Sequence, residues 1–221
     1  MILGLGPYNS YSIKGCEGGL MLIPTIILGW IGILIFLIII FTFQKMVKNN
    51  EFAFLHKLMA LMYAMWLPLP LTLSQLLNSE LLQVGTVFGI VYLIMLVITM
   101  ALQTGHITFM VKHNDDKSIT EKIGDYMMAT LSNPFEGLAN VLKSIWALFL
   151  GITFCNSGEI FMGIIMFLFS LQIFYYLLIV LNTSLVKRIK FFSKAKANTF
   201  VINLETLFFF IVLISYITFY F

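Results

Sequence analysis

Long apolar runs alternate with short polar connections along this chain. Six runs are long enough to cross a bilayer, at residues 22–44, 53–77, 84–111, 134–154, 159–185 and 199–221. A helix that spans ~30 Å of hydrocarbon needs about 20 mostly apolar residues. The runs are continuous, as at 31–43, whereas the strands of membrane barrels alternate over about 10 residues. The pattern predicts an all-α polytopic membrane protein, with six transmembrane helices in one bundle domain over residues 1–221.

The longest connection, between the third and fourth runs, has an amphipathic pattern of its own. Ser118 and Glu121 have the spacing of a capping box, and apolar residues then recur at four-residue steps from Ile119 to Leu131. This predicts a helix over residues 118–131 in the cytoplasmic interface. The helix is either a docking surface for a cytoplasmic or membrane protein partner, or an elbow that steers the chain back into the bilayer.

A new helix is predicted to start directly after this connection, with Asn133 at its N-cap, Pro134 at N1 and Glu136 at N3. Three spans then lie on each side of the central helix, so the second half enters the membrane with the opposite orientation. That layout is common in transporters with inverted repeats, but it also arises by chance in any six-span protein.

The positions of the cations predict the orientation. All of the 13 Lys and Arg residues except Lys14 lie at or near one side when the N-terminus is outside. Cytoplasmic loops retain Lys and Arg, which predicts an N-out/C-out protein of the plasma (cytoplasmic) membrane. The loop at 187–198 carries five cations and no acid, so residues 187–196 either contact anionic lipid or serve orientation alone.

Composition supports a membrane class. The chain is 60% hydrophobic and 10% charged, against about 25% charged residues in soluble domains. The net charge of +3 follows the membrane rule and does not indicate nucleic acid. The lipid bilayer is therefore the first predicted partner.

The second span is interrupted by two prolines, Pro68 and Pro70. Each removes a helical N–H, so the carbonyl groups of Ala64 and Trp66 are predicted to lose their usual partners. In hydrocarbon such groups need protein or water as a replacement. The break is either a transporter-like substrate site or a structural kink.

Polar side chains inside the other spans extend this candidate path. On the third span, Gln103 and His106 share one face with Thr99, and on the fifth span Gln172 aligns with Tyr176. The simplest alternative for any of them is a structural hydrogen bond between helices.

The sixth span carries a carboxylate, Glu205, about two turns from its cytoplasmic end. A charge at this depth is predicted to face the bundle and to pair or be protonated, and it is a functional candidate. The candidate partners are His106, His56 and Lys143.

Two further pairs of residues invite specific chemistry. His56 and His106 are weak candidates for haem or metal ligands, but no HxxxH, HExxH or CxxC pattern supports them, so no metal and no cofactor is predicted. Cys16 and Cys155 both fall at the predicted outer surface, where they form a disulfide or remain two independent apolar residues.

No enzyme signature is present: the chain has no GxSxG, no P-loop and no pair of intramembrane aspartates. The leading hypothesis is a permease or channel subunit for a small solute or ion. The alternative is a non-transporting anchor or assembly subunit of a larger complex, or a membrane-protecting, immunity-type protein; the scarcity of mid-membrane charge favours this class. A haem-binding electron-transfer subunit is the third hypothesis.

Overall fold

The computed structural model describes residues 15–112, 117–185 and 197–220, and within these ranges every element is helical. The elements are α1 (Gly15–Lys48), α2 (Phe52–Met65), α3 (Leu69–Leu77), α4 (Glu80–Lys112), α5 (Lys117–Met127), the π-helix η1 (Met128–Glu136), α6 (Gly137–Asn156), α7 (Ile160–Ser170), α8 (Ile173–Ser184) and α9 (Thr199–Tyr220).

Six of these helical units are long and apolar enough to cross a membrane, as the sequence predicts. They are α1, α2 with α3, α4, the α5–η1–α6 run, α7 with α8, and α9. The all-helical, multi-span class is therefore confirmed, while the N-out/C-out orientation and the choice of membrane stay predictions.

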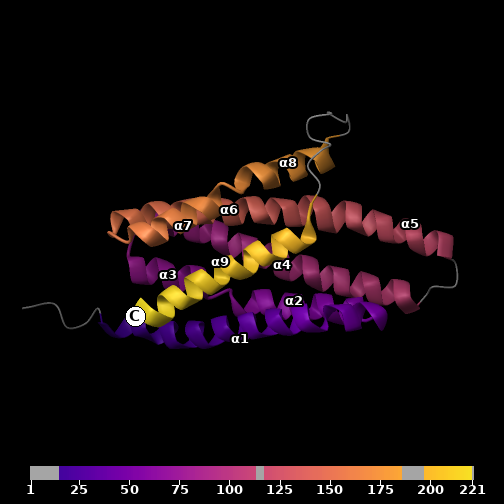
Figure 1. Cartoon of the computed structure of the whole chain (residues 1–221), viewed down its shortest axis with the longest axis horizontal. Helices are drawn as coiled ribbons and strands as arrows, with labels where there is room; N and C mark the ends of the chain where they lie inside the picture. The colour runs from indigo at the N-terminus through magenta and orange to yellow at the C-terminus, as the bar shows by residue number, and fades with distance from the viewer. Residues whose placement is uncertain (1–14, 113–116, 186–196, 221) are drawn as a thin grey trace, which may run out of the picture.

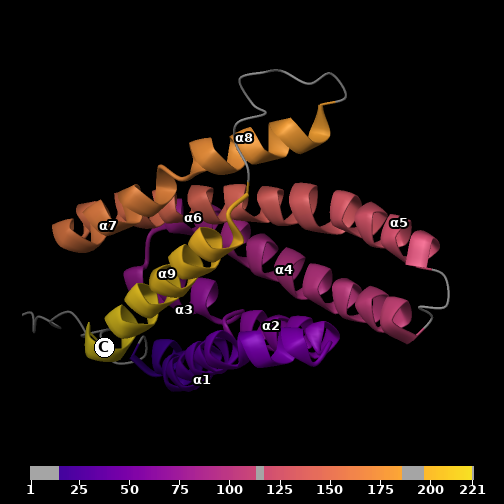
Figure 2. The same ribbon diagram turned by 45° about the vertical axis from the view of Figure 1, so that its right-hand side comes forward.

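The helices form a bundle in which neighbours in sequence pack side by side. α2 and α3 lie between α1 and α4, α6 packs on α4, and α7 and α8 lie on the far side of α6 (Figure 1). The last helix, α9, crosses the bundle obliquely from the α8 side to α1 (Figure 2). This crossing brings side chains of α9 against Lys143 and Trp146 of α6 and Tyr92 of α4.

Aromatic side chains fill the centre where α9 crosses. The ring of Trp66 stacks on Phe210 with centroids 3.8 Å apart, and Trp146 meets Phe209 edge-on at 5.3 Å. Gly89 of α4 makes room for this layer, because a Cβ there would lie 2.6 Å from the Trp146 ring. Edge-on and stacked aromatic pairs are favourable beyond the area that they bury.

The proline break between α2 and α3 is confirmed, and the carbonyl groups of Ala64 and Trp66 take replacement partners from their own backbone. The N–H of Leu67 bonds to the carbonyl of Ala64 at 3.2 Å, and the N–H of Leu69 bonds to that of Trp66 at 3.0 Å. A tighter, 3₁₀-like turn thus supplies both carbonyl groups with partners three residues on. The break leaves neither of these groups free for a substrate.

The predicted helix start at Asn133 and Pro134 is wrong, because both residues lie inside a continuous helix. Helix α5 continues through η1 into α6 along one line (Figure 1), and Pro134 lies inside the π-helix. Proline lacks an N–H and crowds the carbonyl four residues before it, and a wider π turn relieves both problems without a break. The predicted helix over 118–131 is helical, but it is joined to the fourth span; its position relative to a membrane stays a prediction.

Candidate functional site

Glu205 of α9 points into the bundle and forms an ion pair with Lys143 of α6. The ammonium group of Lys143 also donates to the Thr206 hydroxyl at 3.1 Å, and the Tyr176 hydroxyl donates to Oε2 of Glu205 at 3.0 Å. The side chains of the pair are only 1% and 6% exposed. Moving two such charges out of water costs several kcal/mol per ion, which only close pairing and hydrogen bonds can offset.

Sequence reasoning counted Lys143 among the cations at or near the cytoplasmic side, and its level relative to a membrane stays a prediction. Its side chain is buried in the bundle and points at Glu205, so it is not a surface cation. Of the three candidate partners of Glu205, Lys143 makes the contact.

The surroundings of the pair are aromatic on two sides. The Lys143 Nζ lies 5.8 Å from the centroid of the Tyr92 ring and 5.4 Å from that of Tyr176. Both rings are buried, and an ammonium group over a desolvated ring face is attracted by its quadrupole. Side chains from α4, α6, α8 and α9 therefore meet at this one point.

One carboxylate oxygen of the pair is unused. Both contacts of Glu205 go to Oε2, and Oε1 is buried without a hydrogen-bond partner among the residues that the structure describes. A buried acceptor without a partner is costly and rare in folded proteins. It is the kind of atom that a proton, a cation or a water molecule would satisfy.

A second carboxylate lies further along the interface of α4 and α6. Gln103 donates to Oε1 of Glu136 at 2.8 Å. Because the two helices run antiparallel, Thr99 and Asn140 lie one turn from this bond, on the side toward Lys143. The hydroxyl of Thr99 and Oδ1 of Asn140 are buried and also lack hydrogen-bond partners in the described part of the chain.

These residues place polar groups at successive turns between the two carboxylates; Glu136 is half-buried, and the others are buried. We call this set the polar ladder; its members are Gln103, Glu136, Thr99, Asn140, Lys143 and Glu205. Glu136, Asn140 and Lys143 follow one another at four- and three-residue steps, which places them on one side of the helix. The ladder ends at the aromatic layer.

The remaining predicted site residues lie elsewhere. Pro68 and Pro70 contact the α4 and α1 side of the bundle, where Thr86 donates to the Pro70 carbonyl at 3.4 Å. Gln172 is the half-exposed N-cap of α8, one turn before Tyr176. The structure therefore gathers Glu205 with Lys143, and Gln103 with Glu136, but leaves the prolines outside this network.

The two histidines have different surroundings. His56 uses Nδ1 in a 2.7 Å hydrogen bond to the carbonyl of Phe52, on its own helix. His106 lies on the Gln103 side of α4, and its Nε2 is buried without a hydrogen-bond partner among the described residues. The α4 residues that share a pocket with α2 are instead Thr104, Thr108, Val111 and Lys112. This arrangement gives no support to a shared haem iron. Over the described ranges, no group of three metal-ligating side chains is present.

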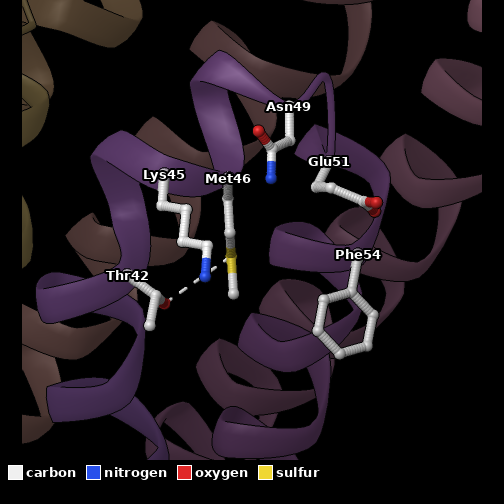
Figure 3. A pocket seen from close by; sticks show the side chains of 6 residues that line it. All are labelled: Thr42, Lys45, Met46, Asn49, Glu51 and Phe54. Carbon is white, nitrogen blue, oxygen red and sulfur yellow. Dashed lines mark hydrogen bonds between the residues drawn. The ribbon is translucent and has the colours of Figure 1, made fainter.

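The pockets lie at a different end of the molecule. Two pockets of about 450 and 470 Å³ open around the connection between α1 and α2, and neither is lined by Glu205 or Lys143. Figure 3 shows the side chains that line the first of them. Neither of these two pockets therefore reaches the polar ladder.

Sequence reasoning missed the role of Glu136, which it assigned to a helix start. It also missed Tyr92, Asn140 and Thr206. The spacing of Glu136, Asn140 and Lys143 could have revealed one polar helix face, had the helix been expected to continue through Pro134.

Two predictions fall partly or wholly outside the described residues. Cys155 forms no disulfide with a cysteine whose side chain is described, and the side chain of Cys16 is not described, so their disulfide stays a prediction. The predicted anionic-lipid segment, residues 187–196, lies entirely outside the described residues.

Comparison with protein-family models, with curated proteins and with solved structures finds no match to this chain.

Proposed function

We propose that this protein is a permease or channel subunit for a small solute or ion, and that a small monovalent cation, the proton included, fits its site best. The observation that carries the proposal is the Lys143–Glu205 pair, buried in a membrane-type bundle with one carboxylate oxygen unused. Ionisable residues inside membrane spans are expensive and commonly mark ion pathways.

The polar ladder supports the same function. Thr99 and Asn140 place oxygen atoms between the two carboxylates that have no hydrogen-bond partner among the described residues. Hard cations coordinate oxygen atoms, and protons move along water molecules that hydrogen-bond to such atoms. A cation at Glu205 would displace the Lys143 ammonium group, whereas a proton would neutralise the carboxylate. Either event removes the ion pair between α6 and α9, which couples the ion to the packing of two helices.

The aromatic layer supports a gate at one end of the ladder. The rings of Trp66, Phe210 and Trp146 are fully buried and close-packed there. Transport under this proposal requires α9 to shift against α6 and open that layer. Helix movements of this kind are the usual basis of alternating access.

The test measures ion flux in liposomes that contain the purified protein. A membrane potential drives uptake of H⁺, Na⁺ or K⁺, each reported by an enclosed dye. Wild-type protein should raise the flux of at least one of these ions above that of protein-free liposomes. Glu205→Gln should abolish that flux, because Gln keeps the shape of the side chain but cannot ionise.

The matched control is Glu80→Gln, which removes an exposed carboxylate at the start of α4. It should transport like the wild type. Absence of flux for all three ions in the wild type, or full flux in Glu205→Gln, contradicts the proposal. Where Glu205→Gln fails to fold, the double variant Lys143→Met/Glu205→Gln replaces it, since it leaves no unpaired charge.

The runner-up function is a non-transporting anchor, assembly subunit or immunity-type protein. Two observations favour it: the carbonyl groups at the proline break are satisfied by their own backbone, and neither pocket at the α1–α2 connection reaches the ion pair. In this case the pair only fixes α9 to α6, and the double variant keeps full biological function.

The third candidate, electron transfer through haem, needs His56 and His106 as ligands. A visible spectrum of the purified protein tests it. A spectrum without a Soret band excludes haem.

A further inference from the structure

The two pockets at the α1–α2 connection adjoin each other. Both are lined by Asn49, Glu51 and Phe54; one extends along α1 to Thr42 and Lys45, and the other reaches across α2 to α4. Their volumes, about 450 and 470 Å³, lie within the range of small-ligand sites, ~300–1,000 Å³. Together they make one groove over three helix ends, which we call the rim groove.

The charge of the rim groove is positive. Lys45 lines one pocket, Lys57 and Lys112 line the other, and Glu51 is the acidic residue of both. Three lysines and one glutamate give a net charge of +2. Among the described residues, Glu51 makes no ion pair with any of these lysines, and its carboxylate points away from Lys45 (Figure 3).

The groove is also amphiphilic. Phe54 and Val111 are 50% and 54% exposed on its walls, next to the side-chain amides of Asn49 and Asn50. The groove lies at the ends of three spans, beside the apolar flank of α1 on which Phe41 is 82% exposed. A ligand here would meet cations and amides at one end and hydrocarbon at the other.

We infer that the rim groove binds the head group of an anionic phospholipid. The phosphate would pair with Lys57 and Lys112, the amides would hydrogen-bond to its oxygen atoms, and an acyl chain would run along the exposed face of α1. Basic pockets between membrane helices recognise anionic head groups in this way. The inference stands independently of the transport proposal, because neither pocket contains a residue of the polar ladder.

A phospholipid fits the groove better than a free phosphate ion. Free phosphate would be attracted by the lysines, but it would leave the side chains of Phe54 and Val111 exposed to water. A lipid covers both surfaces at once.

The test is native mass spectrometry of the full-length protein in detergent, with added phosphatidylglycerol or phosphatidylcholine. Phosphatidylglycerol should bind at least about tenfold more tightly, given ~1 kcal/mol per cation near the surface. Lys57→Gln/Lys112→Gln should weaken its binding by about 30-fold and leave phosphatidylcholine unchanged. Both lysines are exposed, so the substitutions spare the core.

The control is Lys48→Gln/Lys122→Gln, which removes two exposed cations outside the groove. It should retain phosphatidylglycerol binding. If the control loses as much phosphatidylglycerol binding as Lys57→Gln/Lys112→Gln does, the overall positive charge and not the groove attracts the lipid, and the groove assignment is wrong. Equal binding of both lipids, or displacement of phosphatidylglycerol by a tenfold excess of glycerol 1-phosphate, would overturn the inference too.

Discussion

Two interruptions of the apolar spans lie in this bundle: the proline break between α2 and α3, and the Lys143–Glu205 pair between α6 and α9. At the break, the freed carbonyl groups take partners three residues along the same chain. At the ion pair, every partner comes from another helix, and one oxygen atom has none within the described residues.

The two interruptions differ in where their polar groups find partners: in the same turn at the break, and on other helices at the ion pair. Backbone groups at a kink can re-pair through a tighter turn, so the kink places few demands on the rest of the bundle. A buried charge cannot re-pair locally, and it ties its helix to the partner's helix. A site that responds to an ion is therefore expected at the pair and not at the break.

The largest expected effect is on stability when one charge of the pair is removed. Glu205→Gln leaves the Lys143 ammonium group buried and unpaired, which should lower the free energy of unfolding by about 3–5 kcal/mol. Lys143→Met/Glu205→Gln removes both charges and should cost about 1 kcal/mol or less. Unfolding in detergent, followed by tryptophan fluorescence, measures both; a double variant as unstable as the single would contradict the argument.

A smaller effect is expected from the hydrogen bond that joins α8 to the pair. Tyr176→Phe removes the donor to Oε2 of Glu205 and leaves the ring in place. The loss should be about 1.5–3 kcal/mol in unfolding free energy, as for other hydrogen bonds to charged groups. The same change in the Glu205→Gln background should cost less, and a double-mutant cycle measures that difference. Strict additivity would mean that the two side chains act separately.

The smallest effect is expected at the break. The Thr72 hydroxyl bonds to the carbonyl of Pro68 at 3.1 Å and to the Thr25 hydroxyl at 2.8 Å. Thr72→Val removes both bonds at nearly constant volume and should cost about 1 kcal/mol, since the mean in a membrane bundle is ~0.6 kcal/mol per bond. The same detergent unfolding assay applies. A loss as large as that of Glu205→Gln would erase the distinction between the two regions.

The spans could be predicted from the sequence because their signal is local. Continuous apolar length decides whether a helix can cross a bilayer, and the described helices agree with all six runs. The inward direction of Glu205 and its partner Lys143 were also accessible, since a charge in a span needs a partner at similar depth.

Other features depend on information that a local pattern does not carry. The π-helix at Met128–Glu136 keeps α5 and α6 continuous, and it rotates Glu136 toward Gln103. A local view of Asn133 and Pro134 gives a helix start instead, because those residues favour caps. That Thr99 and Asn140 lie at the same height in the bundle can be inferred only once α4 and α6 are known to pack together.

The central claim is that the ion pair serves transport and not only packing. The measurement that tests it most directly is ion flux through Lys143→Met/Glu205→Gln, compared with wild type at equal amounts of folded protein in liposomes. If the pair serves transport, this variant should have near-native stability and no flux above protein-free liposomes, because the bundle remains intact but the ionisable site is gone. Wild-type flux in this variant would contradict that claim and assign the pair to packing alone.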